Sequence, residues 1–170
     1  TSDNFILNLS KRIEFEKMNV LHNMADACIN ISYAEGFGLA TLEAMQVGKP
    51  IIAVKTGGLT RQVVDYRDGS ENGVALDVDW QTCVGSQSVP YIYEDYASVD
   101  KIADGIYKMY MMDSDERKAL GNKAKQYVSE EFAYQDTVDQ WHESLLKLVE
   151  TFKKEPAQRW KIQELSGEAK

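Results

Sequence analysis

The stretch "AEGFGLATLEAMQVGKPIIAV", residues 34–54, decides the fold. The preceding "ACINIS" at 27–32 has the composition of a short buried strand. The two glycines of the EGFG turn permit a sharp change of direction, and residues 39–47 are good helix formers followed by a Gly and a Pro. The apolar run at 51–54 is typical of a parallel strand. The stretch therefore predicts strand, turn, short helix and strand.

The same alternation extends on both sides of this stretch. A short strand is expected at 4–9, and apolar residues recur at helical spacing over 15–25. A second Gly-rich loop, "KTGGLT" at 55–60, precedes a short helix expected at 61–65, and 73–76 is a further strand candidate. Such alternation favours parallel strands with right-handed crossovers, so we predict an α/β fold with an open parallel sheet.

Residues 77–97 break this rhythm, because they have no helical period and combine a Pro with aromatic side chains. We predict an ordered surface loop. Its tyrosines, Tyr91, Tyr93 and Tyr96, either stack on a sugar or a base or hold the loop against the domain, and the sequence leaves both readings open.

The final third of the chain is predicted to be helical, with three apolar stripes that would normally be core. The stripes are Val99, Ile102, Ala103, Ile106, Tyr107 and Tyr110; Leu120, Ala124, Tyr127 and Val128; and Val138, Trp141, Leu145, Leu148, Val149 and Phe152. We expect one domain over 1–154, followed by a polar tail at 155–170.

The composition excludes some classes of protein. A formal charge of −8 and a pI near 4.8 argue against nucleic-acid binding. Cys28, Cys83, His22 and His142 lack the spacing of metal sites or disulfide frameworks. No apolar run has membrane-spanning length. We therefore expect a cytoplasmic protein without a bound metal or a transmembrane segment.

The chemistry of the EGFG turn depends on its place in the fold. Open α/β sheets bind ligands where parallel strands end, and the N–H groups from about Gly38 to Thr41 would suit a phosphate. Glu35 and Glu43 would repel a phosphate unless they accept hydrogen bonds from hydroxyl groups. A nucleotide sugar, with ribose, diphosphate and sugar, fits that arrangement. The alternative is that both carboxylates are ordinary solvated side chains.

The segments "MNVLHNMADACINIS" and "EGFGLATLEAMQVGKPIIAVKTGGLTRQVVD" resemble the C-terminal, donor-binding domain of retaining glycosyltransferases of family four, which have the GT-B fold. The shared hallmark is a Glu, seven residues and a second Glu, here Glu35 and Glu43, followed by a strand and a Gly-Gly loop. The resemblance covers about 15–76 closely and implies the C-terminal half of a GT-B fold.

This resemblance implies a transfer of a sugar from a nucleotide-diphosphate donor to a hydroxyl acceptor with retained configuration, without a metal or other cofactor. Glu35 would be the catalytic residue that contacts the donor sugar, and Glu43 would bind the ribose. The residues implied to present amides to the sugar and diphosphate are Gly36, Phe37, Gly38, Leu39 and Ala40. Asn8, Leu9 and Ser10 would lie near the base.

Some features depart from the family. The Arg and Lys that hold the diphosphate are not matched by "SKRIEF" at 10–15, and no N-terminal acceptor domain is present. We therefore expect part of a two-domain enzyme, inactive alone, with an exposed apolar stripe on the helix at 138–152 that would run toward the missing domain. The segment 77–97 is also longer than the family's usual connection. The alternatives are a nucleotide-sugar epimerase of the same fold and a non-catalytic binding module derived from it.

Overall fold

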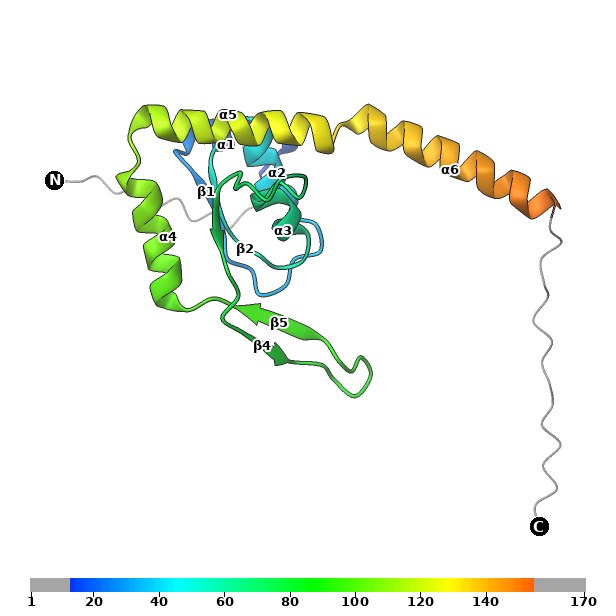
Figure 1. Ribbon diagram of the computed structural model, residues 1–170, viewed down its shortest axis with the longest axis horizontal. Coiled ribbons are helices and arrows are strands. Elements are labelled where there is room, and N and C mark those ends of the chain that lie inside the picture. The colour runs from blue at the N-terminus through cyan, green and yellow to red at the C-terminus, as the bar shows by residue number, and fades with distance from the viewer. Residues whose placement is uncertain (1–12, 155–170) are drawn as a thin grey trace, which may run out of the picture. The chain divides into compact units, whose positions relative to one another are not determined.

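A computed structural model describes residues 13–154 of the chain (Figure 1). The strand expected at 4–9, the suggested base contacts at 8–10 and the polar tail at 155–170 lie outside the described residues. The chain divides into two compact units, 1–131 and 132–170.

A parallel sheet forms the centre of the first unit. Its strands β1 (Cys28–Asn30), β2 (Ile51–Val54) and β3 (Val74–Leu76) lie in the order β1-β2-β3, with Ile29 paired to Ile52 and Ala53 paired to Ala75. All residues of the middle strand are buried. The expected α/β fold with a parallel sheet is confirmed.

Helices α1 (Phe15–Met24), α2 (Leu39–Gln46) and α3 (Gly57–Val63) connect and flank these strands. The expected α2 is confirmed almost to the residue. The helix expected at 61–65 is wrong in its start, because α3 already begins at the Gly-Gly pair. Glycine has a low helix propensity, but the start of α3 needs it because this part of the helix lies in close contact with the EGFG turn.

Helices α4 (Val99–Met111) and α5 (Ser114–Glu131) complete the unit. Successive residues of a strand point to opposite faces of a sheet, so β2 is covered on both sides. One face packs against α4 in a cluster of buried side chains, and α2 and α3 contact β2 as well. The cluster consists of Ile52, Val54, Val74, Leu76 and Met109.

The apolar stripe predicted for α4 is largely wrong, whereas that of α5 is confirmed. Tyr107 and Tyr110 of α4 are 62% and 77% exposed, and the buried positions are Gly105 and Met109. A Cβ on Gly105 would lie 2.7 Å from a Leu76 methyl group, so the missing side chain lets the helix approach the sheet. A prediction based on the spacing of apolar residues does not detect a packing face that is formed by a glycine. In α5, the expected core residues Ala124, Tyr127 and Val128 are buried.

Residues 77–97 form a β-hairpin, so the loop prediction is wrong for its two arms. Strands β4 (Trp80–Cys83) and β5 (Tyr93–Tyr96) pair antiparallel, with Trp80 opposite Tyr96. Each arm is short, and neither shows the clean alternation that marks a half-buried strand. In Figure 1 the hairpin projects from the body of the sheet and helices.

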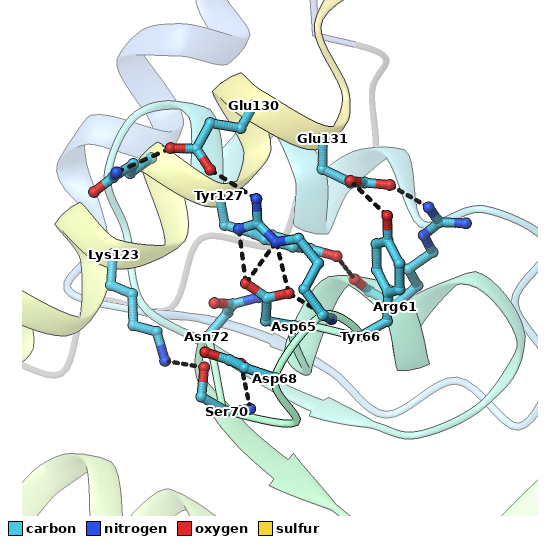
Figure 2. A network of polar contacts seen from close by, with 12 residues as sticks. Arg61, Asp65, Tyr66, Asp68, Ser70, Asn72, Lys123, Tyr127, Glu130 and Glu131 are labelled. Carbon is cyan, nitrogen blue, oxygen red and sulfur yellow. Dashed lines mark hydrogen bonds and ion pairs between the residues drawn. The ribbon is translucent and has the colours of Figure 1, made fainter.

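A polar network connects α5 to the segment that follows α3 (Figure 2). The Arg67 guanidinium donates to both oxygens of Asp65 and to Glu130, and Arg61 pairs with Glu131. The hydrogen bonds from Arg67 lower the pKa of Asp65, a residue that is only 5% exposed. Lys123 also donates from α5 to the carbonyl of Glu71 at 2.6 Å. These bonds fix α5 against the loop that leads into β3.

The second unit contains α6 (Tyr134–Lys154), none of whose residues is buried. The apolar stripe of α6 from Val138 to Phe152 is exposed, with Trp141 at 65% and Phe152 at 66%. This exposure agrees with the expectation drawn from the resemblance. No helix between residues 13 and 154 is both long and apolar enough to cross a membrane.

Candidate functional site

The site expected at the end of β1 begins with a short polar turn. The Ser32 backbone N–H and hydroxyl donate to Asn30 Oδ1 at 3.1 and 2.7 Å. The Asn30 amide in turn donates to the hydroxyl of Thr41, in the first turn of α2, at 3.2 Å. Side chains of Asn and Ser favour such local bonds to the backbone. The exit of β1 is thereby linked to the start of α2.

The N-terminus of α3 packs directly on the backbone of the EGFG turn. The N–H of Gly58 donates to the carbonyl of Glu35 at 3.1 Å, and the Gln62 amide donates to the carbonyl of Phe37 at 2.6 Å. A Cβ on Gly57 would lie 1.9 Å from the Glu35 carbonyl oxygen, which no real side chain could occupy. The two Gly-rich loops of the sequence are therefore in direct contact, and the backbone conformation of each depends on that of the other.

The two glycines of the EGFG turn have different structural roles. Gly38 is buried at φ +90° and is the residue immediately before α2, where a Cβ would lie 2.6 Å from a Leu59 methyl group. Gly36 lies outside the left-handed region and faces open space. The conformation of the turn therefore requires a glycine at position 38 but not at position 36.

The first turn of α2 offers backbone donors. Gly38 carries no side chain to cap it, and the first N–H groups of any α-helix have no partner within the helix. Leu39 and Ala40 are exposed, and Phe37 is 45% exposed. This part of the predicted site is thus accessible, as an anion-binding helix start requires.

Glu35 and Glu43 occupy different surroundings. Glu35 is half-buried in the turn that α3 holds. The Glu43 side chain is 37% exposed, and one carboxylate oxygen lies 3.3 Å from His22 Nε2. Glu43 also lines a cavity of about 370 Å³ between α1 and α2, and Glu35 is not among its lining residues. The other residues that line this cavity are Phe15, Glu16, Met18, Asn19, His22, Gln46 and Val47.

His22 contacts a residue of the predicted site, and sequence reasoning did not identify this contact. Its side chain is only 12% exposed and reaches Glu43 from α1, with β1 lying between the two helices in the chain. No periodicity or local spacing connects residues so far apart in sequence, so the pattern of α1 carried no signal for this contact.

One cation near the ends of the parallel strands is already paired. Lys55, directly after β2, pairs with Asp77, and its hydrogen bond lowers the pKa of that carboxyl group. An anion would therefore compete with Asp77 for this lysine. Among residues 13–154 no group of three or more His, Cys, Asp or Glu side chains is arranged to hold a metal ion.

The chain is similar to curated glycosyltransferases over its central part. It is 32% identical over 85 residues to D-inositol 3-phosphate glycosyltransferase of Mycobacteroides abscessus, which is 46% of this chain and 19% of that protein. It is 37% identical over 57 residues to trehalose synthase of Pyrococcus horikoshii, or 34% of this chain and 14% of that protein. The chain thus spans about a fifth or less of these relatives.

Solved structures share the fold. Sucrose-phosphate synthase from Thermosynechococcus elongatus aligns with a TM-score of 0.63 at 24% identity, over 82% of this chain and 29% of that chain. The catalytic domain of starch synthase IV from Arabidopsis thaliana aligns with a TM-score of 0.55 at 21% identity, over 78% of this chain and 24% of that chain. These likenesses confirm the predicted fold, a parallel α/β sheet with a helical C-terminal part as in GT-B glycosyltransferases.

The family model described as glycosyl transferases group 1 matches residues 6–127. This match includes the EGFG turn, the Gly-Gly start of α3 and both glutamates of the predicted site. The chain belongs to the glycosyl transferases group 1 family.

Proposed function

We propose that residues 1–154 are part of the nucleotide-sugar-binding domain of a retaining glycosyltransferase. In this proposal the enzyme transfers a sugar from a nucleotide-diphosphate donor to a hydroxyl group of an acceptor. A further N-terminal domain would complete the active site, so the chain alone would be inactive. We place the protein in the cytoplasm, where the free Cys28 and Cys83 would stay reduced.

The observation that best supports the proposal is the contact between the two Gly-rich loops. Bonds from Gly58 and Gln62 fix the carbonyls of Glu35 and Phe37. Carbonyl groups held in this way point toward α3, and the turn itself stays at the carboxyl end of β1. A rigid turn at that edge is where an open α/β sheet binds its ligand.

Each predicted residue has a distinct role in this proposal. Glu35 would be the catalytic residue, accepting hydrogen bonds from hydroxyls of the donor sugar. Glu43 would bind the ribose hydroxyls, and His22, by donating to one of its oxygens, would leave the other oxygen for the ligand. The residues that would present amides to the sugar and diphosphate are Gly36, Phe37, Gly38, Leu39 and Ala40.

The proposed chemistry moves one proton and one sugar. The bond between the anomeric carbon and the diphosphate breaks, the acceptor oxygen bonds to that carbon on the same face, and a donor phosphate oxygen takes the acceptor proton. Glu35 would align the donor rather than act as a nucleophile, so its contribution is positioning and electrostatic. No metal enters these steps.

The two glutamates can be tested separately by amide shift changes in NMR titrations of the chain with UDP, GDP and ADP and their glucose conjugates. Glu43→Gln should weaken binding of the preferred nucleotide at least tenfold, equivalent to about 1.4 kcal/mol, because the ribose loses a charged acceptor. Glu35→Gln should leave nucleotide affinity unchanged and weaken only the sugar conjugate.

Glu143→Gln is the matched control, because it removes the same charge from an exposed position of α6. Its affinity should equal that of the unchanged chain. Equal affinities for the Glu43 and Glu143 variants would contradict the ribose role, and the absence of binding by all three nucleotides would overturn the proposal as a whole.

A further inference from the structure

The β4–β5 hairpin is held against the proposed donor site. The N–H of Asp95 donates to the carbonyl of Tyr33 at 2.7 Å, and Tyr33 lies two residues before Glu35. The Asp95 carboxylate accepts from the hydroxyl of Thr56 at 2.7 Å, and Thr56 directly precedes the Gly-Gly start of α3. The hairpin therefore contacts both loops that form the EGFG turn and its support.

One face of the hairpin is aromatic. In an antiparallel pair, residues directly opposite each other share a face, and alternate residues of each strand return to it. Trp80 lies opposite Tyr96, and Thr82 lies opposite Glu94, so these four side chains share one face. The Tyr96 ring stacks on Trp80 at 5.5 Å between centroids and on Tyr33 at 4.4 Å.

These rings are not used to fill the core. Trp80 is 50% exposed and Tyr33 is 55% exposed, and every residue of β4 is exposed. The Tyr96 hydroxyl donates to Glu94 at 2.6 Å, which orders the carboxylate beside the rings. Exposed aromatic surface rimmed by polar groups is typical of a binding site rather than of a hairpin that only stabilises itself.

The chemistry of this face selects its ligand. Flat ring faces pack against the C–H face of a sugar ring, and a carboxylate and a hydroxyl accept and donate hydrogen bonds to sugar hydroxyls. Glu94 and the nearby Asp95 would repel phosphate groups, which disfavours a nucleotide or a nucleic acid on the same rings. The ligand that fits is an uncharged, polyhydroxylated ring.

We propose that the face formed by Tyr33, Trp80, Thr82, Glu94 and Tyr96 binds part of the carbohydrate acceptor of the transfer reaction, and that the further N-terminal domain of the proposed enzyme would hold the rest of it. This inference rests on the proposed function, because an acceptor must lie beside the donor sugar that Glu35 would contact. The backbone bond between Asp95 and Tyr33 keeps the acceptor face next to that position. The hairpin thus accounts for the length of the segment between β3 and α4.

The probes for this face are maltotriose, cellotriose and mannotriose. Binding of each to the chain is measured by saturation-transfer NMR and by amide shifts of the hairpin residues. At least one probe should bind saturably, with the largest shifts in residues 80–82 and 94–96. Trp80→Ala should weaken that binding at least tenfold, and Glu94→Gln, which keeps the side-chain shape, should weaken it severalfold.

Tyr93→Ala is the matched control, since Tyr93 is an exposed aromatic of the same hairpin on its opposite face. It should bind the saccharide as the unchanged chain does. Equal loss in the Tyr93 and Trp80 variants would show an effect of hairpin folding and overturn the assignment. The inference is also overturned if none of the three trisaccharides binds.

Nucleotide titrations of the same variants separate this inference from the proposed function. Trp80→Ala should bind UDP, GDP or ADP as the unchanged chain does. Nucleotide binding without saccharide binding would refute only the acceptor face. Saccharide binding without nucleotide binding would leave a sugar-binding hairpin and refute its role as the acceptor site of a nucleotide-sugar transferase.

Discussion

Replacing Gly57 by Ala tests whether the EGFG turn and the start of α3 depend on each other's shape. Gly57 has φ +45°, and an added Cβ would lie 1.9 Å from the carbonyl oxygen of Glu35. Neither chain segment can move freely, because Gly58 and Gln62 bond to the same turn. The added methyl group must therefore push the turn away from α3.

The expected loss of stability has three sources. A left-handed conformation costs an L-residue about 1–2 kcal/mol, overpacking costs about 1–3 kcal/mol, and a weakened bond from Gly58 to Glu35 costs about 1 kcal/mol. The smaller unfolded-state entropy of Ala offsets about 0.4–1 kcal/mol. We expect Gly57→Ala to lower the free energy of unfolding by about 3–5 kcal/mol, a large part of a domain's stability.

Urea unfolding of the chain, followed by circular dichroism, measures this loss by linear extrapolation. Gly69→Ala is the matched control, because Gly69 has φ +76° but no heavy atom within 4 Å of its Cβ position. It should cost only about 1 kcal/mol, the conformational part alone. If the two variants lose the same stability to within about 0.5 kcal/mol, the contact between the loops does not carry the energy assigned to it.

Three further predictions concern other parts of the first unit. Gly36→Ala should leave the urea midpoint of unfolding unchanged, because the added Cβ meets open space. It should weaken binding of the preferred nucleotide sugar in NMR titrations if the donor occupies that space. An unchanged affinity would contradict the role proposed for Gly36. Arg67→Met should lower thermal stability more than Glu130→Gln does. Removing Arg67 leaves the buried carboxylate of Asp65 without its guanidinium partner, whereas the carboxylate of Glu130 is exposed. A larger loss of stability in Glu130→Gln, measured by calorimetry, would be inconsistent with the network in Figure 2. Hydrogen bonds from Lys101 and from the Ser98 N–H lower the pKa of Asp79 from 3.8 to about 2, so its ionised form stabilises the fold above pH 4 and this contribution is lost as the pH falls toward 2. The stability difference between the unchanged chain and Asp79→Asn should therefore shrink over that interval, and a constant difference in acid titrations would argue against these bonds to Asp79.

The parallel core could be predicted from the sequence because its signals are local. The apolar run at 51–54, the helix formers at 39–47 and the Gly-Pro stop between them all agree with the observed β2 and α2. Each of these signals depends on a few neighbouring residues. The packing face of α4 could not be predicted in this way, since Gly105 contributes to it by lacking a side chain.

The hairpin and the His22–Glu43 contact were missed for a related reason. Trp80 and Tyr96 meet across sixteen positions of sequence, and His22 of α1 meets Glu43 of α2 across 21 positions. Such contacts follow from the register of the fold and not from any local period. Both glutamates could nevertheless be proposed as site residues, because the family pattern is a short local motif that is visible in the sequence.

The EGFG motif alone does not show why each of its two glycines is present. In sequence its two glycines are equivalent, and both can be attributed to a sharp turn. In the structure only Gly38 adopts positive φ and fits under Leu59, while Gly36 has neither requirement. A glycine with open space at its Cβ position costs conformational entropy on folding without a structural return, so under the proposed function the reason for Gly36 would be a ligand that approaches the backbone there. The donor sugar of the proposed reaction is the ligand that would do so, since the neighbouring carboxylate of Glu35 lies in the same turn.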